Sequence, residues 1–117
     1  RRKAVDYYTE LLKDNPKIKL PKTTNNGFHS HQSFCIFVEN RDELMDYMRN
    51  NEVEVQIGTF ALHTHNAFKN SKLCVLQNNY PNSNYSFDHC LTLPLYNELT
   101  ENQQNEIVKL LNEFLNK

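Results

Sequence analysis

Two pairs of histidines, each separated by one residue, are the clearest candidates for chemistry in this sequence. His29 and His31 form one pair, and His63 and His65 form the other. Imidazoles two residues apart on a strand lie on one face, which is the spacing that a divalent metal needs. Neither pair has an acidic neighbour that could complete a ligand set or orient a ring. Two interpretations therefore stay open: a stand-alone module that binds metal through these four histidines, or surface histidines without a ligand.

The three cysteines, Cys35, Cys74 and Cys90, predict a reducing environment. Their number is odd, they are widely spaced, and they contain no C-x-x-C pair, so a secreted disulfide scaffold is not indicated. We therefore predict a cytoplasmic protein in which each cysteine packs as a small hydrophobic residue. His89 adjoins Cys90, but adjacent side chains on a short element point in different directions, so no nucleophile and base are predicted there.

Length and charge narrow the function classes. The 117 residues suffice for one domain with one core, and the formal net charge is −1. Because acidic and basic residues are interspersed, neither a nucleic-acid-binding stripe nor a basic membrane-binding patch is predicted. No apolar run reaches the ~18 residues that a membrane span requires. Gly27 and Gly58 are the only glycines, so the glycine-rich phosphate-binding signatures are missing.

Hydrophobic periodicity predicts the elements that must position these residues. Helical spacing predicts helices over residues 3–14, 41–50 and 101 to the end, and a helical turn over 66–68 within a long loop, 63–84. Strand patterns predict 28–39 as the central strand, 53–57 as a strand with one wet face, and a short strand from Cys90 that ends near Pro94. A short helix is predicted over 84–90. Asn40 with Glu43, and Thr100 with Gln103, have capping-box spacing. The order predicts a small α+β domain.

The order of several motifs resembles a known family. The motifs are "RDEL" at 41–44, the histidine loop "LHTHNAF" at 62–68, "LTLPLYNELT" at 91–100, and a closing helix from Glu101. Together they resemble the C-terminal small domain of the DegT/StrS family of PLP-dependent nucleotide-sugar aminotransferases, which have the aspartate-aminotransferase fold type. The resemblance runs from about Val5 to the end of the sequence. It implies a small, largely antiparallel sheet flanked by helices.

The resemblance also implies a function for the parent enzyme. Such enzymes transfer an amino group, usually from glutamate, to a keto-sugar carried on a nucleotide, in the biosynthesis of amino sugars or surface polysaccharides. Their PLP-binding large domain precedes the small domain and is absent from residues 1–117. We therefore expect no PLP in this fragment, no catalytic residue and no activity in isolation. The parent is expected to be a homodimer.

The resemblance further implies that the loop from Gly58 to His65 faces the sugar-binding cleft. His63, Phe60 and Thr59 are the expected substrate contacts. Many relatives have a histidine or an aromatic residue near position 58, where this chain has glycine. The sugar specificity of those relatives therefore does not carry over directly.

Overall fold

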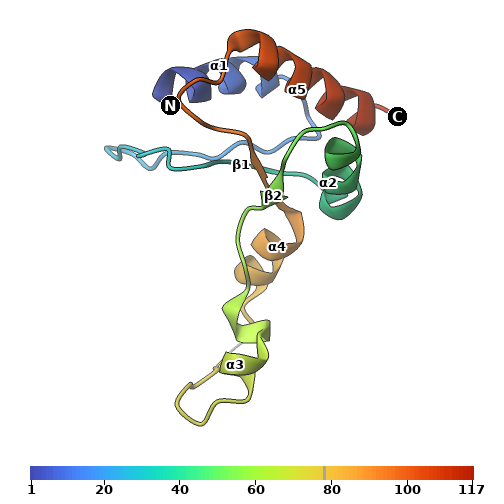
Figure 1. The fold of residues 1–117 in the computed structure, drawn as a ribbon. Helices are drawn as coiled ribbons and strands as arrows, with labels where there is room; N and C mark the ends of the chain where they lie inside the picture. The colour runs from blue at the N-terminus through green and yellow to red at the C-terminus, as the bar shows by residue number, and fades with distance from the viewer. Residues whose placement is uncertain (78) are drawn as a thin grey trace.

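The computed structural model describes residues 1–77 and 79–117. Within these ranges, helices and short strands alternate in an α+β fold, which confirms the predicted class (Figure 1). The predicted loop 63–84 includes residue 78, which lies outside the described residues. In chain order the elements are α1 Arg2–Leu12, β1 Phe34–Phe37, α2 Arg41–Asn50, β2 Gln56–Ile57, η1 Leu62–Thr64, α3 Asn66–Lys69, α4 Pro81–His89, β3 Cys90–Leu93 and α5 Glu101–Leu115.

The described strands form a three-stranded antiparallel sheet in the order β1-β3-β2. Phe34 pairs with Leu93 on one side of β3, and Gln56 pairs with Thr92 on the other. The central strand is therefore β3, and our prediction of a central strand over 28–39 was wrong. On its outer side, β1 makes an isolated bridge between Phe37 and Lys19.

The core lies on one face of this sheet. Phe34 and Ile36 of β1 and Leu91 and Leu93 of β3 alternate onto that face and are fully buried. α1 and α5 lie side by side over them, and α2 covers the flank (Figure 1). Tyr8 of α1 stacks on Phe34 with ring centroids 5.2 Å apart and donates its hydroxyl to the Pro94 carbonyl, 3.1 Å away. Each such side chain contributes about 1.5 to 3 kcal/mol by leaving water.

The first two strands are shorter than their apolar patterns predicted. β1 starts at Phe34 rather than at residue 28, because His31 has a left-handed backbone with a φ of 52°. The His31 N–H donates to His29 Nδ1, 2.9 Å away, so this segment forms a local loop rather than a ladder. β2 contains Gln56 and Ile57 only.

One predicted capping box forms and the other does not. The Thr100 hydroxyl accepts a hydrogen bond from the Gln103 N–H at 3.2 Å, and the Gln103 side chain accepts from the Thr100 N–H at 2.9 Å. The Asn40 side chain makes no cap bond to α2, so the box with Glu43 was a wrong prediction. Asn40 has φ −102° and ψ 58°, which is outside the extended conformation usual at an N-cap.

The other helices agree with the sequence more closely. α2 has the predicted bounds, α3 occupies the predicted helical turn, and α1 and α5 each end about two residues early. α4 starts at Pro81, three residues before the prediction, because proline suits the first turn of a helix. None of the described helices has the length and hydrophobicity needed to cross a bilayer.

Residues 58–89 leave the sheet after β2 and return to it at β3, and we call them the arm (Figure 1). Among the described residues, none between 58 and 89 belongs to the core cluster. The Cα radius of gyration is 16.0 Å, with extents of 50 × 37 × 27 Å. A compact domain of this length has about 13 Å. The molecule therefore consists of a compact body and a projecting arm that carries η1, α3 and α4.

Candidate functional site

The arm begins at Gly58, where the chain passes very close to β3. The Gly58 N–H donates to the Cys90 carbonyl at 2.9 Å, which extends the ladder by one bond. A Cβ atom built on Gly58 would lie 2.2 Å from Cys90 Sγ and 3.0 Å from Cys90 Cβ. Glycine is therefore needed here because the two backbones lie too close together for a side chain. A left-handed backbone is not the reason, since the φ of Gly58 is not positive.

Thr59 and Phe60 follow at the base of the arm, and both are exposed. The Phe60 ring is 56% exposed. It forms a T-shaped pair with His65 at a centroid distance of 5.9 Å and lies 6.1 Å from the Phe87 ring of α4. Such aromatic pairs restrain a ring without burying it. Phe60 therefore presents an aromatic surface held in one orientation.

His63 is built into the arm rather than directed away from it. Its Nε2 lies 2.9 Å from Asn84 Oδ1, and its ring packs on Tyr80 at 4.7 Å between centroids. Asn84 in turn donates to the Asn79 carbonyl at 2.8 Å. His63 therefore joins η1 to α4 and is half-buried. The sequence did not identify Asn84, because nothing in a single chain pairs residues 21 positions apart.

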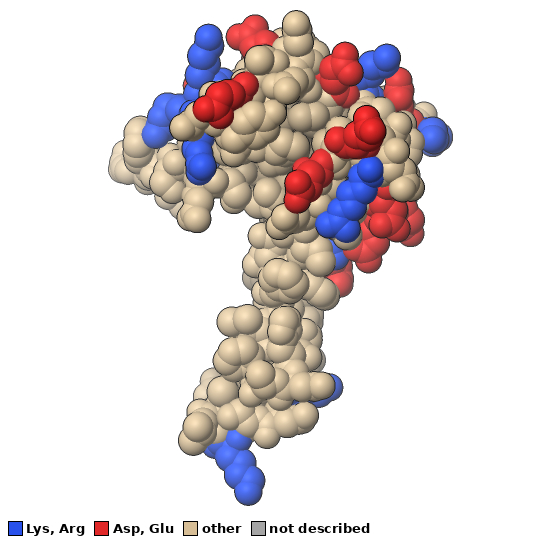
Figure 2. Space-filling view, viewed as in Figure 1, with Lys and Arg blue, Asp and Glu red and all other residues tan. Residues whose placement is uncertain are grey.

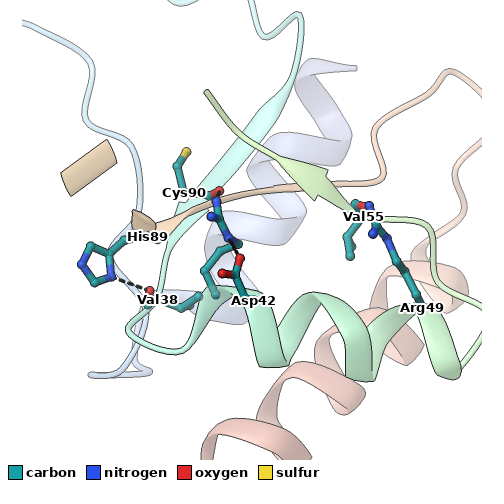
Figure 3. Close-up of polar contacts among 7 residues, drawn as sticks. Val38, Asp42, Arg49, Val55, His89 and Cys90 are labelled. Atoms are coloured by element: carbon teal, nitrogen blue, oxygen red, sulfur yellow. Dashed lines mark hydrogen bonds and ion pairs between the residues drawn. The ribbon is translucent and has the colours of Figure 1, made fainter. Parts of the chain in front are cut away.

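Three polar side chains fasten the root of the arm to the body (Figure 3). Arg41, at the start of α2, is buried and donates from Nη1 to the Cys90 carbonyl at 3.0 Å and from Nε to Asp42 at 2.6 Å. His89 Nδ1 lies 3.1 Å from the Val38 carbonyl. Arg49, in the last turn of α2, donates twice to the Val55 carbonyl, at 3.1 and 2.9 Å.

These clamps hold the two chain segments that flank the arm. Val55 stands just before β2, and Cys90 begins β3. A buried guanidinium needs several acceptors to offset its lost hydration, and Arg41 has a carbonyl and a carboxylate. Sequence reasoning missed this role of Arg41, although the "RDEL" motif at 41–44 marked its position.

The arm surface differs from the rest of the molecule in charge. Figure 2 shows acidic and basic side chains spread over the body, whereas the arm is almost free of them. Only Lys69, Lys72 and Asp88 carry formal charge between residues 58 and 89. Leu73 is 96% exposed and Val75 is 80% exposed. A surface with few charges and exposed large apolar side chains is typical of an interaction surface.

The four-histidine metal site does not form in the structure. His29 and His31 stack on each other, 4.4 Å between centroids, in the loop before β1, whereas His63 and His65 lie in the arm. Across residues 1–77 and 79–117, no group of three or more His, Cys, Asp or Glu side chains could hold a metal ion. The separation follows from the fold, since the two pairs lie on different excursions from the sheet (Figure 1).

The residues of this chain do not make a PLP site by themselves. PLP enzymes hold the cofactor through a lysine Schiff base and an acidic partner for the pyridine nitrogen. All lysines here are exposed on the surface, so none stands in an enclosed pocket where such a bond would be protected from water. No step of a reaction is therefore assigned to a residue of this chain through PLP.

The cysteines agree only in part with the prediction that all of them belong to the core. Cys90 is buried, but Cys35 and Cys74 are half-buried, and all are free thiols. The Cys35 thiol lies on the sheet face opposite the core, where Sγ is 3.3 Å from Thr92 Oγ1. The apolar residues around Cys35 in "FCIF" indicated burial on both faces, but the second face of β1 is only partly covered.

Comparison with known proteins gives a consistent result. The family model of the DegT/DnrJ/EryC1/StrS aminotransferases matches residues 1–112. A "Pleiotropic regulatory protein" from Geobacillus stearothermophilus is 26% identical over 117 residues, which cover 97% of this chain and 31% of that protein.

Two solved structures have the same fold over nearly the whole chain. A DegT DnrJ EryC1 StrS aminotransferase from Brucella abortus superimposes with a TM-score of 0.83 at 26% identity, covering 99% of this chain and 30% of that one. DesV from S. venezuelae, solved with a ketimine intermediate, has a TM-score of 0.87 at 21% identity, covering all of this chain and 32% of that one. The chain thus spans about a third of the length of these relatives.

Proposed function

Because the chain belongs to the DegT/DnrJ/EryC1/StrS aminotransferase family, we propose that it is the C-terminal small domain of a PLP-dependent sugar aminotransferase. The parent enzyme would transfer an amino group, from glutamate, to a keto-sugar linked to a nucleotide. It would act in amino-sugar or surface-polysaccharide biosynthesis, as a cytoplasmic homodimer. The observation that carries the proposal is the clamped arm with its exposed surface of few charges, on a chain that covers only 30% of a solved relative.

The arm supplies the substrate side of the cleft in this proposal. Thr59 offers a hydroxyl and Phe60 an apolar ring, both exposed at the base of the arm. A sugar ring presents hydroxyl groups at its edge and C–H groups on its faces, so this combination suits it. His63 would meet the substrate through the part of its ring that Asn84 and Tyr80 leave uncovered.

The clamps at the root give the arm its proposed role. Contacts that hold a substrate in the productive geometry lower the entropic part of the barrier, so a rigid base for those contacts favours the reaction. Arg41 and Arg49 fix the two strands from which the arm departs, and His89 fixes the end of α4. The chain's own residues would therefore bind and orient the sugar, while the chemistry of amino transfer is supplied by groups outside residues 1–117.

The first test is to produce this chain together with the remainder of a family-length protein encoded upstream. We expect a protein that binds PLP and shows aldimine absorbance, and that uses glutamate and a nucleotide-linked keto-sugar as substrates. A product without aldimine absorbance would refute the proposed function.

The second test concerns the arm. In that protein, Phe60→Ala and Thr59→Ala are expected to raise the KM for the sugar about five- to tenfold, since each contact is worth about 1 to 1.4 kcal/mol. The glutamate half-reaction should be unchanged. Phe28→Ala is the matched control, because Phe28 is an exposed phenylalanine in the loop before β1. Equal effects of all three substitutions would place the sugar elsewhere.

A further inference from the structure

The face of the sheet opposite the core carries two cysteines that the proposed function does not use. In the register of β1 and β3, Cys35 pairs with Thr92 and Phe37 pairs with Cys90. Cys35, Phe37, Thr92 and Cys90 therefore share one face, and the two thiols are diagonal neighbours across the two strands.

Donors surround Cys35 Sγ on several sides. The Thr92 hydroxyl is 3.3 Å away and the Ser33 hydroxyl is 3.7 Å away, and Cys90 is the diagonal neighbour on the same face. A thiolate accepts bonds from all of these groups, whereas a thiol gains less from them. His29 adds favourable charge near Cys35, and Arg41 lies near Cys90. Hydrogen bonding by Cys90, then by Thr92 and Ser33, lowers the pKa of Cys35 to about 5 against the opposing effect of burial.

The two thiols also differ in access. Cys35 is half-buried on an edge strand, whereas Cys90 is 4% exposed, next to Gly58 and beside the Arg41 clamp. Hydrogen bonding to Cys35 and burial raise the pKa of Cys90, so it stays protonated and donates. Redox-sensitive cysteine pairs have this asymmetry, with an accessible thiolate beside a second thiol that resolves its oxidised form.

We propose that Cys35 is a peroxide-reactive thiol and that Cys90 is its resolving partner, so that hydroperoxides join β1 to β3 by a disulfide. In the first step, Cys35 sulfur attacks a peroxide oxygen. An S–O bond forms, the O–O bond breaks, and the departing oxygen takes a proton to leave as water or an alcohol. Sulfur is oxidised by two electrons, to a sulfenic acid, and the peroxide is reduced by two.

In the second step, Cys90 sulfur attacks the sulfenic sulfur. The S–S bond forms, the S–O bond breaks, and the proton from Cys90 leaves with the hydroxyl group as water. Diagonal neighbours in a sheet start somewhat farther apart than a disulfide requires. Formation of the disulfide therefore requires a local backbone shift of β1, which is an edge strand, relative to β3. A strained disulfide of this kind is readily reduced by thiols, so the change is reversible.

The first experiment measures thiol reactivity by site. The purified chain is alkylated with iodoacetamide at pH 6, 7 and 8, and each cysteine is quantified by peptide mass spectrometry. We expect the rate at Cys35 to change less than about twofold between pH 6 and pH 8, whereas the same cysteine in urea should change about tenfold per pH unit. Thr92→Val, which removes one donor, should restore part of the pH dependence. A tenfold rise per pH unit at Cys35 in the folded chain would refute the proposal.

The second experiment follows oxidation by hydrogen peroxide. We expect a Cys35–Cys90 crosslinked peptide in the wild type and in Cys74→Ser, which is the matched control. Cys90→Ser should accumulate a dimedone-reactive sulfenic acid at Cys35, and Cys35→Ser should leave Cys90 unmodified. Circular dichroism checks that each variant is folded, and Cys90→Ala replaces Cys90→Ser if the hydroxyl is not tolerated. Oxidation at Cys74 first, or disulfides only between chains, would overturn the assignment.

Discussion

Gly58 lies so close to β3 that the structure leaves no room for a side chain at this position. The Cβ of an alanine there would lie 2.2 Å from Cys90 Sγ. We expect Gly58→Ala to lower the free energy of unfolding by about 1 to 3 kcal/mol, as overpacking does. Urea denaturation measures this loss.

A double-mutant cycle tests whether the contact with Cys90 causes the loss of stability in Gly58→Ala. With Cys90→Ala the sulfur is removed, so the added methyl group of Gly58→Ala should cost less than half as much. If the two substitutions are additive within about 0.5 kcal/mol, the contact with Cys90 is not the cause. The sequence marked Gly58 as a departure from relatives, but the reason for glycine lies 32 residues away and only the strand pairing shows it.

A second single-residue prediction concerns the pKa of Tyr8 and the stability of the protein at alkaline pH. Burial, and then the nearby Tyr96, raise the pKa of Tyr8 well above its ordinary value of 10.0. Its folded form stays neutral while the unfolded form ionises, so the stabilising effect is complete below pH 10 and is lost as pH rises above it. The loss is about 1.4 kcal/mol for each pH unit above 10.

Tyr8→Phe tests this pH dependence. At pH 7 the variant should be less stable by about 1 kcal/mol, because it lacks the hydrogen bond to the Pro94 carbonyl. Between pH 10 and pH 11.5 its stability should fall less steeply than that of the wild type. Parallel curves from urea titrations over that range would show that Tyr8 does not control alkaline unfolding.

At the scale of elements, the two capping-box sequences provide a comparison within one chain. Thr100→Ala removes a side-chain bond to the first turn of α5, so we expect a loss of about 1 kcal/mol in the free energy of unfolding. Asn40→Ala, the matched control, removes no cap bond from α2 and should change stability by less than about 0.5 kcal/mol. Equal losses in thermal or urea unfolding would contradict the observed caps.

The same comparison shows what sequence can predict of an element. Thr-x-x-Gln and Asn-x-x-Glu have the same spacing, and both helices start at the expected residue. The Asn40 backbone, however, has to turn from β1 toward the Arg41 clamp, and that tertiary requirement displaces its side chain from the cap position. Helix positions followed from local periodicity, whereas strand ends depended on pairing partners far along the chain.

At the scale of the whole molecule, the body and the arm have different sources of stability. Apolar periodicity predicted the residues of the body because they bury one continuous core. The arm has no such pattern, so its course could not be inferred from the sequence. It is held by single contacts such as His63 to Asn84 and by the clamps at its root. We therefore expect the arm to open without unfolding of the body.

Native-state hydrogen exchange tests whether the arm opens independently of the body. The variant His63→Ala makes the test more specific, because it weakens the arm alone. Amides of α3 and α4 should exchange by local opening, while those of β3 and α5 exchange only by global unfolding. His63→Ala removes about 1 kcal/mol from the arm, so exchange in α4 should accelerate roughly fivefold with the Tm unchanged. His65→Ala is the control, because His65 is exposed and its ring makes a T-shaped contact with Phe60. If His63→Ala instead accelerated β3 and α4 equally, arm and body would form one cooperative unit, and the arm could not adjust to a ligand independently of the core.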